Sequence, residues 1–163
     1  MQNSPAVPLI SALNRLAIVT PDLDRFVDFY QRVLGLELSF REDTPRFRHA
    51  ILRSGALSWL HPVEVPGSGH GTASGQAFHR GHLDHTALTA ASPDTFNELR
   101  RRLVACGARD GSVDDLGAFQ TLWFADPDGM RVELTLIVDS LLSSIHAPVR
   151  QVPADAQSVS MAP

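Results

Sequence analysis

The residue best suited to chemistry is a histidine that stands in one copy of a repeated stretch. His85 lies in LDHTALTA, and the similar stretch LNRLAIVT has Arg15 at the same place. A neutral imidazole binds metal ions or transfers a proton near neutral pH. A guanidinium stays protonated and cannot bind a cation, but it offers a fork of N–H donors to an anion. The repeat therefore leads to two interpretations: a metal site that lacks a ligand, or a site that never held a metal.

Composition removes several classes of chemistry. The chain has 163 residues, of which 44% are hydrophobic and 20% charged, as expected for one domain with its own core. All 14 basic residues are arginines, so no lysine is present for a Schiff base or a phosphate-binding loop. Cys106 is the single cysteine, which excludes an intrachain disulfide and a cysteine cluster for zinc.

Charge and hydropathy also limit the partners. The net charge of −4 gives no sign of the basic surface that nucleic acid or an anionic membrane requires. No apolar run approaches the length of a membrane span, and MQNSPAVPLI does not have the basic and apolar parts of a signal sequence. A cytoplasmic protein with a small-molecule partner is therefore expected.

The stretch with Arg15 opens a first module of predicted elements. LNRLAIVT predicts a strand, and TPDLDRFVDFYQRVLG predicts a helix with Thr20 as its cap, Pro21 in its first position and Gly35 at its end. The apolar residues of this helix share one face: Leu23, Phe26, Val27, Tyr30, Val33 and Leu34. Three strand-like runs follow: LELSFRE, RFRHAILR and ALSWLHPV.

The stretch with His85 opens a second module of the same order. LDHTALTA predicts a strand, and SPDTFNELRRRLVACG predicts a helix capped by Ser92 and ended by Gly107. Its apolar face is formed by Phe96, Leu99, Leu103 and Val104. The runs ARDGSVDDLG, AFQTLWFAD and GMRVELTLIV predict three strands, with a tight turn at DPDG. The repeat thus predicts an α+β fold of two tandem β-α-β-β-β modules.

The remaining segments lie outside the two modules. Module one spans residues 13–62 and module two residues 83–138, after an N-terminal extension of residues 1–12. Residues 63–82 form a Gly- and Ser-rich connection, which we expect to be flexible or to cover a pocket. In the tail, residues 139–163, LLSSI suggests one or two helical turns and PADAQSVSMAP suggests disorder.

Two motifs in this framework resemble a known family. FYQRVLGLEL after the first helix and FADPDGMRVEL near the end are similar to the vicinal oxygen chelate superfamily, over roughly residues 13–138. That superfamily includes glyoxalase I, extradiol dioxygenases and metal-free bleomycin-binding proteins. The resemblance implies that each module curls its sheet into half of a cup, and that the protein forms a homodimer. It also implies metal ligands on the first and last strand of each module.

The implied ligand positions can be located in this sequence. Counting from the glycine that opens each last strand gives Trp59 and Glu133, and the first strands give Arg15 and His85. Only His85 and Glu133 can donate to a metal. His61, two residues after Trp59, would share its face of the strand and could complete the two-histidine, one-carboxylate set of non-haem iron oxygenases. One divalent ion, of Fe, Mn, Ni or Zn, would then be the cofactor of a glyoxalase- or dioxygenase-type enzyme.

The other interpretation is a pocket without the full metal site. Arg15 would bind the carboxylate of a small acid, and the Trp59 ring would stack on a planar ligand, with His61 nearby. His85 and Glu133 would serve as acid and base. Two questions stay open: whether Arg15 or Asn14 faces the cup, and whether the ligand is only bound or also transformed.

The other histidines have weaker functional interpretations. His49 lies in a predicted strand and could face either side of the sheet. His70, His79 and His82 belong to the Gly-rich connection, where one of them could fold over the cup as a proton carrier. His146, in the tail, has no assigned role.

Overall fold

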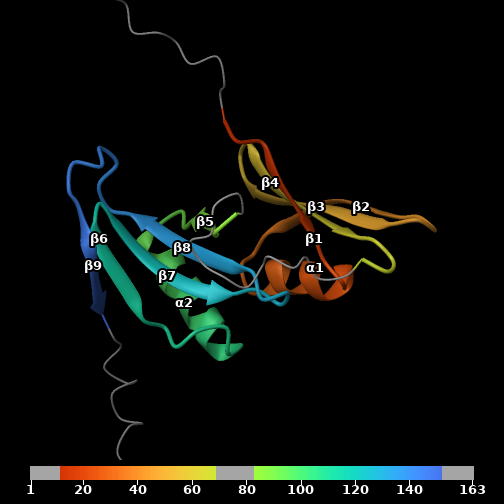
Figure 1. The fold of residues 1–163 in the computed structure, drawn as a ribbon. Helices are drawn as coiled ribbons and strands as arrows, with labels where there is room; N and C mark the ends of the chain where they lie inside the picture. Colours follow the sequence, from red (N-terminus) through yellow and green to blue (C-terminus); the bar gives the residue numbers. More distant parts are fainter. Residues whose placement is uncertain (1–11, 69–82, 152–163) are drawn as a thin grey trace, which may run out of the picture.

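The two predicted modules are present in the computed structural model, which describes residues 12–68 and 83–151 (Figure 1). Module one contains β1 (Arg15–Val19), α1 (Leu23–Arg32), β2 (Glu37–Asp43), β3 (Arg48–Gly55) and β4 (Ser58–Glu64). Module two contains β5 (Thr86–Thr89), α2 (Pro93–Ala105), β6 (Val113–Gly117), β7 (Phe119–Ala125) and β8 (Arg131–Ile137). The prediction of an α+β fold with two β-α-β-β-β modules is confirmed.

Each module builds its own mixed sheet. The strand order is β1-β4-β3-β2 in the first sheet and β5-β8-β7-β6-β9 in the second, where β9 is Ile145–Gln151. In both sheets the first strand of the module runs parallel to its last strand, and the other pairs are antiparallel. The two strands that carry the family's ligand positions are therefore neighbours in each sheet.

The tail continues the second sheet instead of forming the suggested helical turn. Leu142 has a positive φ of 53°, which is incompatible with a right-handed helix at LLSSI. The backbone N–H of Ala118 donates to the carbonyl of Ser144, and β9 then pairs with β6. The parts of the chain outside the described residues are 1–11, 69–82 and 152–163, which include His70, His79 and His82.

The helix termini agree with the sequence in three places of four. Ser92 caps α2, because its Oγ accepts from the Thr95 N–H at 3.1 Å. Helix α1 is capped by Asp22 and begins at Leu23, so the predictions of Thr20 as the cap and Pro21 as the first helical residue were wrong. The backbone N–H of Thr20 is still bonded to β4, at the carbonyl of Val63, and the helix can begin only after it. Gly35 and Gly107 follow the two helices with φ of 74° and 73°.

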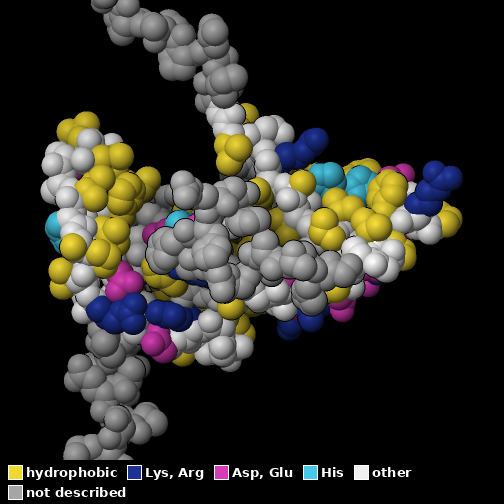
Figure 2. Space-filling model, viewed as in Figure 1, with side chains coloured by type: hydrophobic (Ala, Val, Ile, Leu, Met, Phe, Trp, Pro, Cys, Tyr) yellow, Lys and Arg dark blue, Asp and Glu magenta, His cyan; other side chains and the backbone are white. Residues whose placement is uncertain are grey.

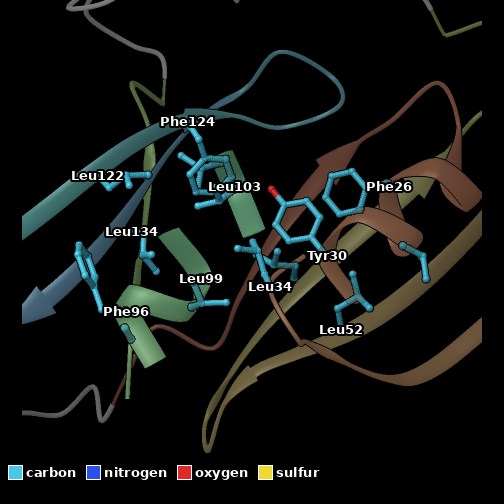
Figure 3. Packing of buried hydrophobic residues seen from close by; sticks show 14 of the residues in the cluster. Phe26, Tyr30, Leu34, Leu52, Phe96, Leu99, Leu103, Leu122, Phe124 and Leu134 are labelled. Atoms are coloured by element: carbon cyan, nitrogen blue, oxygen red, sulfur yellow. The ribbon is translucent and has the colours of Figure 1, made fainter. Parts of the chain in front are cut away.

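A continuous core joins the two modules (Figure 3). Tyr30 stacks on Phe26, with ring centroids 4.4 Å apart, and its hydroxyl donates to Asp126 Oδ2 at 3.1 Å in the β7–β8 turn. Arg25 of α1 also pairs with Asp128 of the same turn at 2.5 Å. Helix α1 therefore packs on its own sheet and is also bonded to module two. Val104, predicted to face the core, is 45% exposed, so the apolar face of α2 is narrower than expected.

Each sheet packs one face against its helix, and we call the opposite side its open face. In module one the helix face carries buried residues such as Ala50, Leu52 and Leu60. In module two it carries Val132 and Leu134. No helix among the described residues is long and apolar enough to cross a membrane.

Candidate functional site

The open face of module one carries a tryptophan between two arginines. Trp59 of β4 is the register partner of Arg15 on β1 and of Arg53 on β3. Register partners point to the same side of a sheet, while the intervening Leu16 and Leu60 pack toward the core. Arg15, and not Asn14, thus lies on the open face. The Arg15 side chain is exposed and Trp59 is half-buried, so both are accessible to a ligand.

Beside this row, three polar side chains form a hydrogen-bonded chain. His61 Nε2 lies 2.9 Å from His49 Nδ1, and His49 Nε2 lies 2.9 Å from Glu42 Oε2. Figure 2 shows histidines together with hydrophobic side chains at the right of the view, over the four-stranded sheet. Burial lowers the pKa of His61, and the neighbouring His49 and Arg15 lower it further. His61 is therefore predominantly neutral near neutral pH.

The open face of module two carries the second half of the predicted constellation. His85 Nε2 lies 3.3 Å from Glu133 Oε2, so the structure brings these two residues together. The other ring nitrogen, Nδ1, lies 2.8 Å from Asp84 Oδ2, which orients the imidazole. The side chain of His85 is 33% exposed and that of Glu133 is 13% exposed. A ring held by one carboxylate and facing another is suited to exchanging a proton or binding a cation.

An aromatic ring and a guanidinium surround this pair. The Trp123 ring meets His85 edge-on, with centroids 4.6 Å apart. Arg131 lies over the Trp123 ring, with its guanidinium carbon 4.7 Å from the centroid, and its Nη1 is 3.3 Å from Asp84 Oδ2. Module two therefore repeats the combination of tryptophan and arginine seen in module one.

The family's full metal site does not fit the residues present. Arg15 and Trp59 occupy two of the four ligand positions and have no lone pair for a cation. The third donor proposed from the sequence, His61, lies on the first sheet, whereas His85 and Glu133 belong to module two. On the first sheet, His61 is hydrogen-bonded to His49. Within residues 12–68 and 83–151, no group of three or more His, Cys, Asp or Glu side chains could hold a metal ion. The 3.3 Å between His85 Nε2 and Glu133 Oε2 matches two ligands of one ion, which lie about 3.0 to 3.4 Å apart for bonds of about 2.1 Å, but no third donor joins them among the described residues.

Arg53, Trp123, Arg131 and Asp84 were missed in the sequence, and the face of His49 was left open. Arg53 and His49 alternate with buried Ala50 and Leu52 along β3, a pattern that assigns them to the open face once one residue is placed. Trp123 and Arg131 could be found in the same way, because Trp123 is opposite Glu133. The contact of Asp84 with His85 depends on side-chain rotamers and has no sequence signal.

Sequence comparison assigns the chain to a family. It matches the model of the Glyoxalase/Bleomycin resistance protein/Dioxygenase superfamily over residues 12–134. The chain belongs to this superfamily, as its motifs indicated. A search of curated proteins finds no match.

Solved structures share the fold at low sequence identity. A glyoxylase/bleomycin resistance protein/dioxygenase domain from Frankia sp. EAN1pec is 24% identical, with a TM-score of 0.62 over 78% of this chain and 98% of that one. A glyoxalase family protein from Enterococcus faecalis is 21% identical, with a TM-score of 0.60 over 78% and 99% of the two chains. A lactoylglutathione lyase from Agrobacterium tumefaciens is 19% identical, with a TM-score of 0.59 over 83% and 98%. These likenesses establish the fold and not the reaction.

Proposed function

We propose that this protein binds a small, planar organic acid on the open face of module one and does not use the family's four-ligand metal site. The observation that carries this proposal is the row in which Trp59 lies between Arg15 and Arg53. An indole ring offers a stacking surface, and a guanidinium offers two parallel N–H donors to a carboxylate. The same residues that cannot bind a cation are therefore suited to an aromatic or conjugated anion.

Module two would supply acid–base chemistry to such a ligand. Asp84 holds Nδ1 of His85, and Nε2 faces Glu133 at 3.3 Å, so a proton can be shared between the two side chains. Trp123 and Arg131 offer a second aromatic and cationic surface beside them. We propose His85 and Glu133 as the acid and base of module two.

A homodimer is part of this proposal. The two halves of the constellation, Arg15 with Trp59 and His85 with Glu133, lie on different sheets of one chain. In a homodimer, the open face of module one could meet that of module two from a second copy. Light scattering on the purified protein tests the dimer. From the composition, we also propose that the protein is cytoplasmic.

A metal-dependent glyoxalase- or dioxygenase-type enzyme is the second candidate function. It is favoured by the contact between Asp84 and His85, because histidines that bind metals commonly donate their other ring N–H to a carboxylate. His85 and Glu133 would bind the ion, of Fe, Mn, Ni or Zn. Further donors would have to come from outside the described residues or from the ligand.

Fluorine NMR with two matched probes tests acid binding. 4-Fluorobenzoate and the neutral 4-fluorobenzamide have nearly the same shape, so their difference reports on the carboxylate. We expect the protein to broaden and shift the benzoate signal, and Arg15→Gln to weaken binding about tenfold, since a hydrogen bond to a charged group contributes about 1.5 kcal/mol. Arg46→Gln, an exposed arginine in the β2–β3 turn, is the control for net charge. Equal binding of the benzamide, or no effect of Arg15→Gln, would refute the proposal.

A further inference from the structure

Three hydrogen-bonded side chains, Glu42, His49 and His61, connect neighbouring strands of the first sheet. The function proposed above gives them no role. Glu42 of β2 stands directly opposite His49 of β3. His49 is opposite Val63 of β4, two residues beyond His61, so the two imidazoles are diagonal neighbours on the open face. The 2.9 Å contacts from His61 to His49 and from His49 to Glu42 link three strands of the sheet.

The carboxylate at one end determines which nitrogens carry protons. A carboxylate only accepts hydrogen bonds, so His49 donates to Glu42 through Nε2–H. In neutral His49, Nδ1 is then an acceptor, and His61 must donate to it through Nε2–H. Nδ1 of His61 is left with its lone pair. No described residue makes a hydrogen bond to this atom, which is thus free to accept a proton from a ligand.

The three hydrogen-bonded side chains lead from the open face of module one to solvent. Glu42 is 51% exposed, whereas the His49 side chain is 18% exposed and meets the rings of Phe40 and Phe47 at 5.4 and 5.2 Å. His49 is therefore shielded, and Glu42 is the polar end that exchanges protons with water. Arg15, on the neighbouring strand, acts electrostatically on His61, and Glu42 is linked to His61 through His49.

We propose that Glu42, His49 and His61 form a proton relay that makes His61 a general base toward an acidic group of the bound ligand. In this step Nδ1 of His61 takes a proton from the ligand, the Nε2 proton of His61 passes to Nδ1 of His49, and the Nε2 proton of His49 passes to Glu42. Glu42 releases a proton to water, and the ligand's new negative charge pairs with Arg15. His61 is the catalytic residue, and His49 and Glu42 are positioning residues.

The relay indicates a ligand class. It requires an anion that carries a second, ionisable C–H, N–H or O–H group within reach of His61, beside the Arg15–Trp59 row. This part rests on the proposed function, because the acid must bind there first. The tautomers and the reactivity of His61 do not depend on a bound acid, so they can fail or hold independently of acid binding.

Imidazole ¹⁵N NMR tests the hydrogen-bond chain in the free protein. At pH 8 we expect both His49 and His61 to carry their proton on Nε2. His61→Gln and His49→Gln assign the signals. In Glu42→Gln, His49 should lose its single tautomer. A His61 ring protonated on Nδ1 in the parent would overturn the relay.

Ethoxyformylation by diethyl pyrocarbonate, followed by peptide mass spectrometry, tests whether the chain acts as a base. Nδ1 of His61 forms a bond to a carbonyl carbon, monoethyl carbonate leaves and decays to carbon dioxide and ethanol, and the Nε2 proton passes to His49. We expect His49→Phe to slow the modification of His61 about tenfold, a modest part of what a positioned general base contributes.

Glu42→Gln is a second variant. Because the Glu42 side chain is half-exposed, we expect this change to leave the fold intact. Glu42→Gln should slow the modification of His61 severalfold and move the midpoint of its pH–rate profile to lower pH, because a negative charge that favours the imidazolium is removed. His146 on β9 is the internal control and should react at the same rate in every protein. If both variants leave the rate and the pH profile of His61 unchanged, the relay does not exist, whatever the result with fluorobenzoate.

Discussion

Arg15 lies directly beside Trp59, as register partners of the parallel strands β1 and β4. The resemblance implies metal ligands on these strands in the metal-dependent members of the family, whereas here the strands carry an arginine and a tryptophan. Beside the same ring, on β3, lies Arg53. The side chains of Arg15 and Trp59 both lie on the open face. The residues at these positions therefore determine which ligands this face is suited to bind.

Fluorescence can rank the two arginines. Trp123→Phe leaves Trp59 as the single tryptophan of the chain. We expect benzoate to change the emission of Trp59 in this protein, with a larger loss of affinity for Arg15→Gln than for Arg53→Gln. The reason is that Arg53 already faces Glu37 at 3.8 Å, which offsets part of its charge. The reverse order would assign the main anion contact to Arg53.

Arg15→His should create or strengthen binding of divalent metal ions. The change removes a positive charge and adds an imidazole at a family ligand position. Titration calorimetry with Ni(II) or Zn(II) measures it, and Arg53→His, which adds a histidine on the other side of Trp59, is the matched control. If Arg15→His binds metal no better than the parent, the assignment of Arg15 to a ligand position is wrong.

Tyr30→Phe should lower the free energy of unfolding by about 1–2 kcal/mol, because it removes a hydrogen bond to the buried carboxyl group of Asp126. Urea unfolding measures the loss. Phe26→Leu, on the same helix, is a comparison that removes aromatic packing but keeps this hydrogen bond.

Asp126 should also give stability a pH dependence. Burial raises the pKa of this carboxyl, and Asp128 raises it further, although the backbone N–H groups of Met130 and Asp128 oppose the rise. The folded state then holds the proton more tightly than the unfolded one, so this group's contribution is complete below the ordinary carboxyl pKa of about 4 and is lost as pH rises through the folded value. Asp126→Asn keeps the backbone contacts and should lose less stability than the parent between pH 4 and pH 8. A parallel pH dependence in both proteins would contradict this role.

The fold could be predicted because its signals are local and repeated. Serine favours the start of a helix and glycine its end, as seen at Ser92, Gly35 and Gly107. The apolar face of each helix could be predicted from the spacing of its apolar residues. Thr20 failed as a cap because β1 continues its pairing with β4 through that residue, a tertiary contact invisible in the local pattern. Strand β9 was missed because the edge strand has no buried residue, and burial is what gives a strand its alternation.

The candidate site could be predicted only in part. His85 and Glu133 were paired through the repeat, and their 3.3 Å contact agrees with that interpretation. The expected grouping of His61 with them is not found in this chain, because His61 lies on the other sheet and is bonded to His49. Alternation assigns a face along one strand, but it cannot determine how two sheets are placed relative to each other.

Elemental analysis by mass spectrometry tests most directly whether the site has lost the family's metal. Untagged parent protein and Glu133→Ala are soaked with Fe(II), Mn(II), Ni(II) and Zn(II), dialysed and analysed side by side. We predict that neither protein retains a stoichiometric transition metal, since Arg15 and Trp59 replace two ligands and no third donor joins His85 and Glu133 among the described residues. A near-stoichiometric metal in the parent that is lost in Glu133→Ala would contradict the proposal and establish a metal-dependent site.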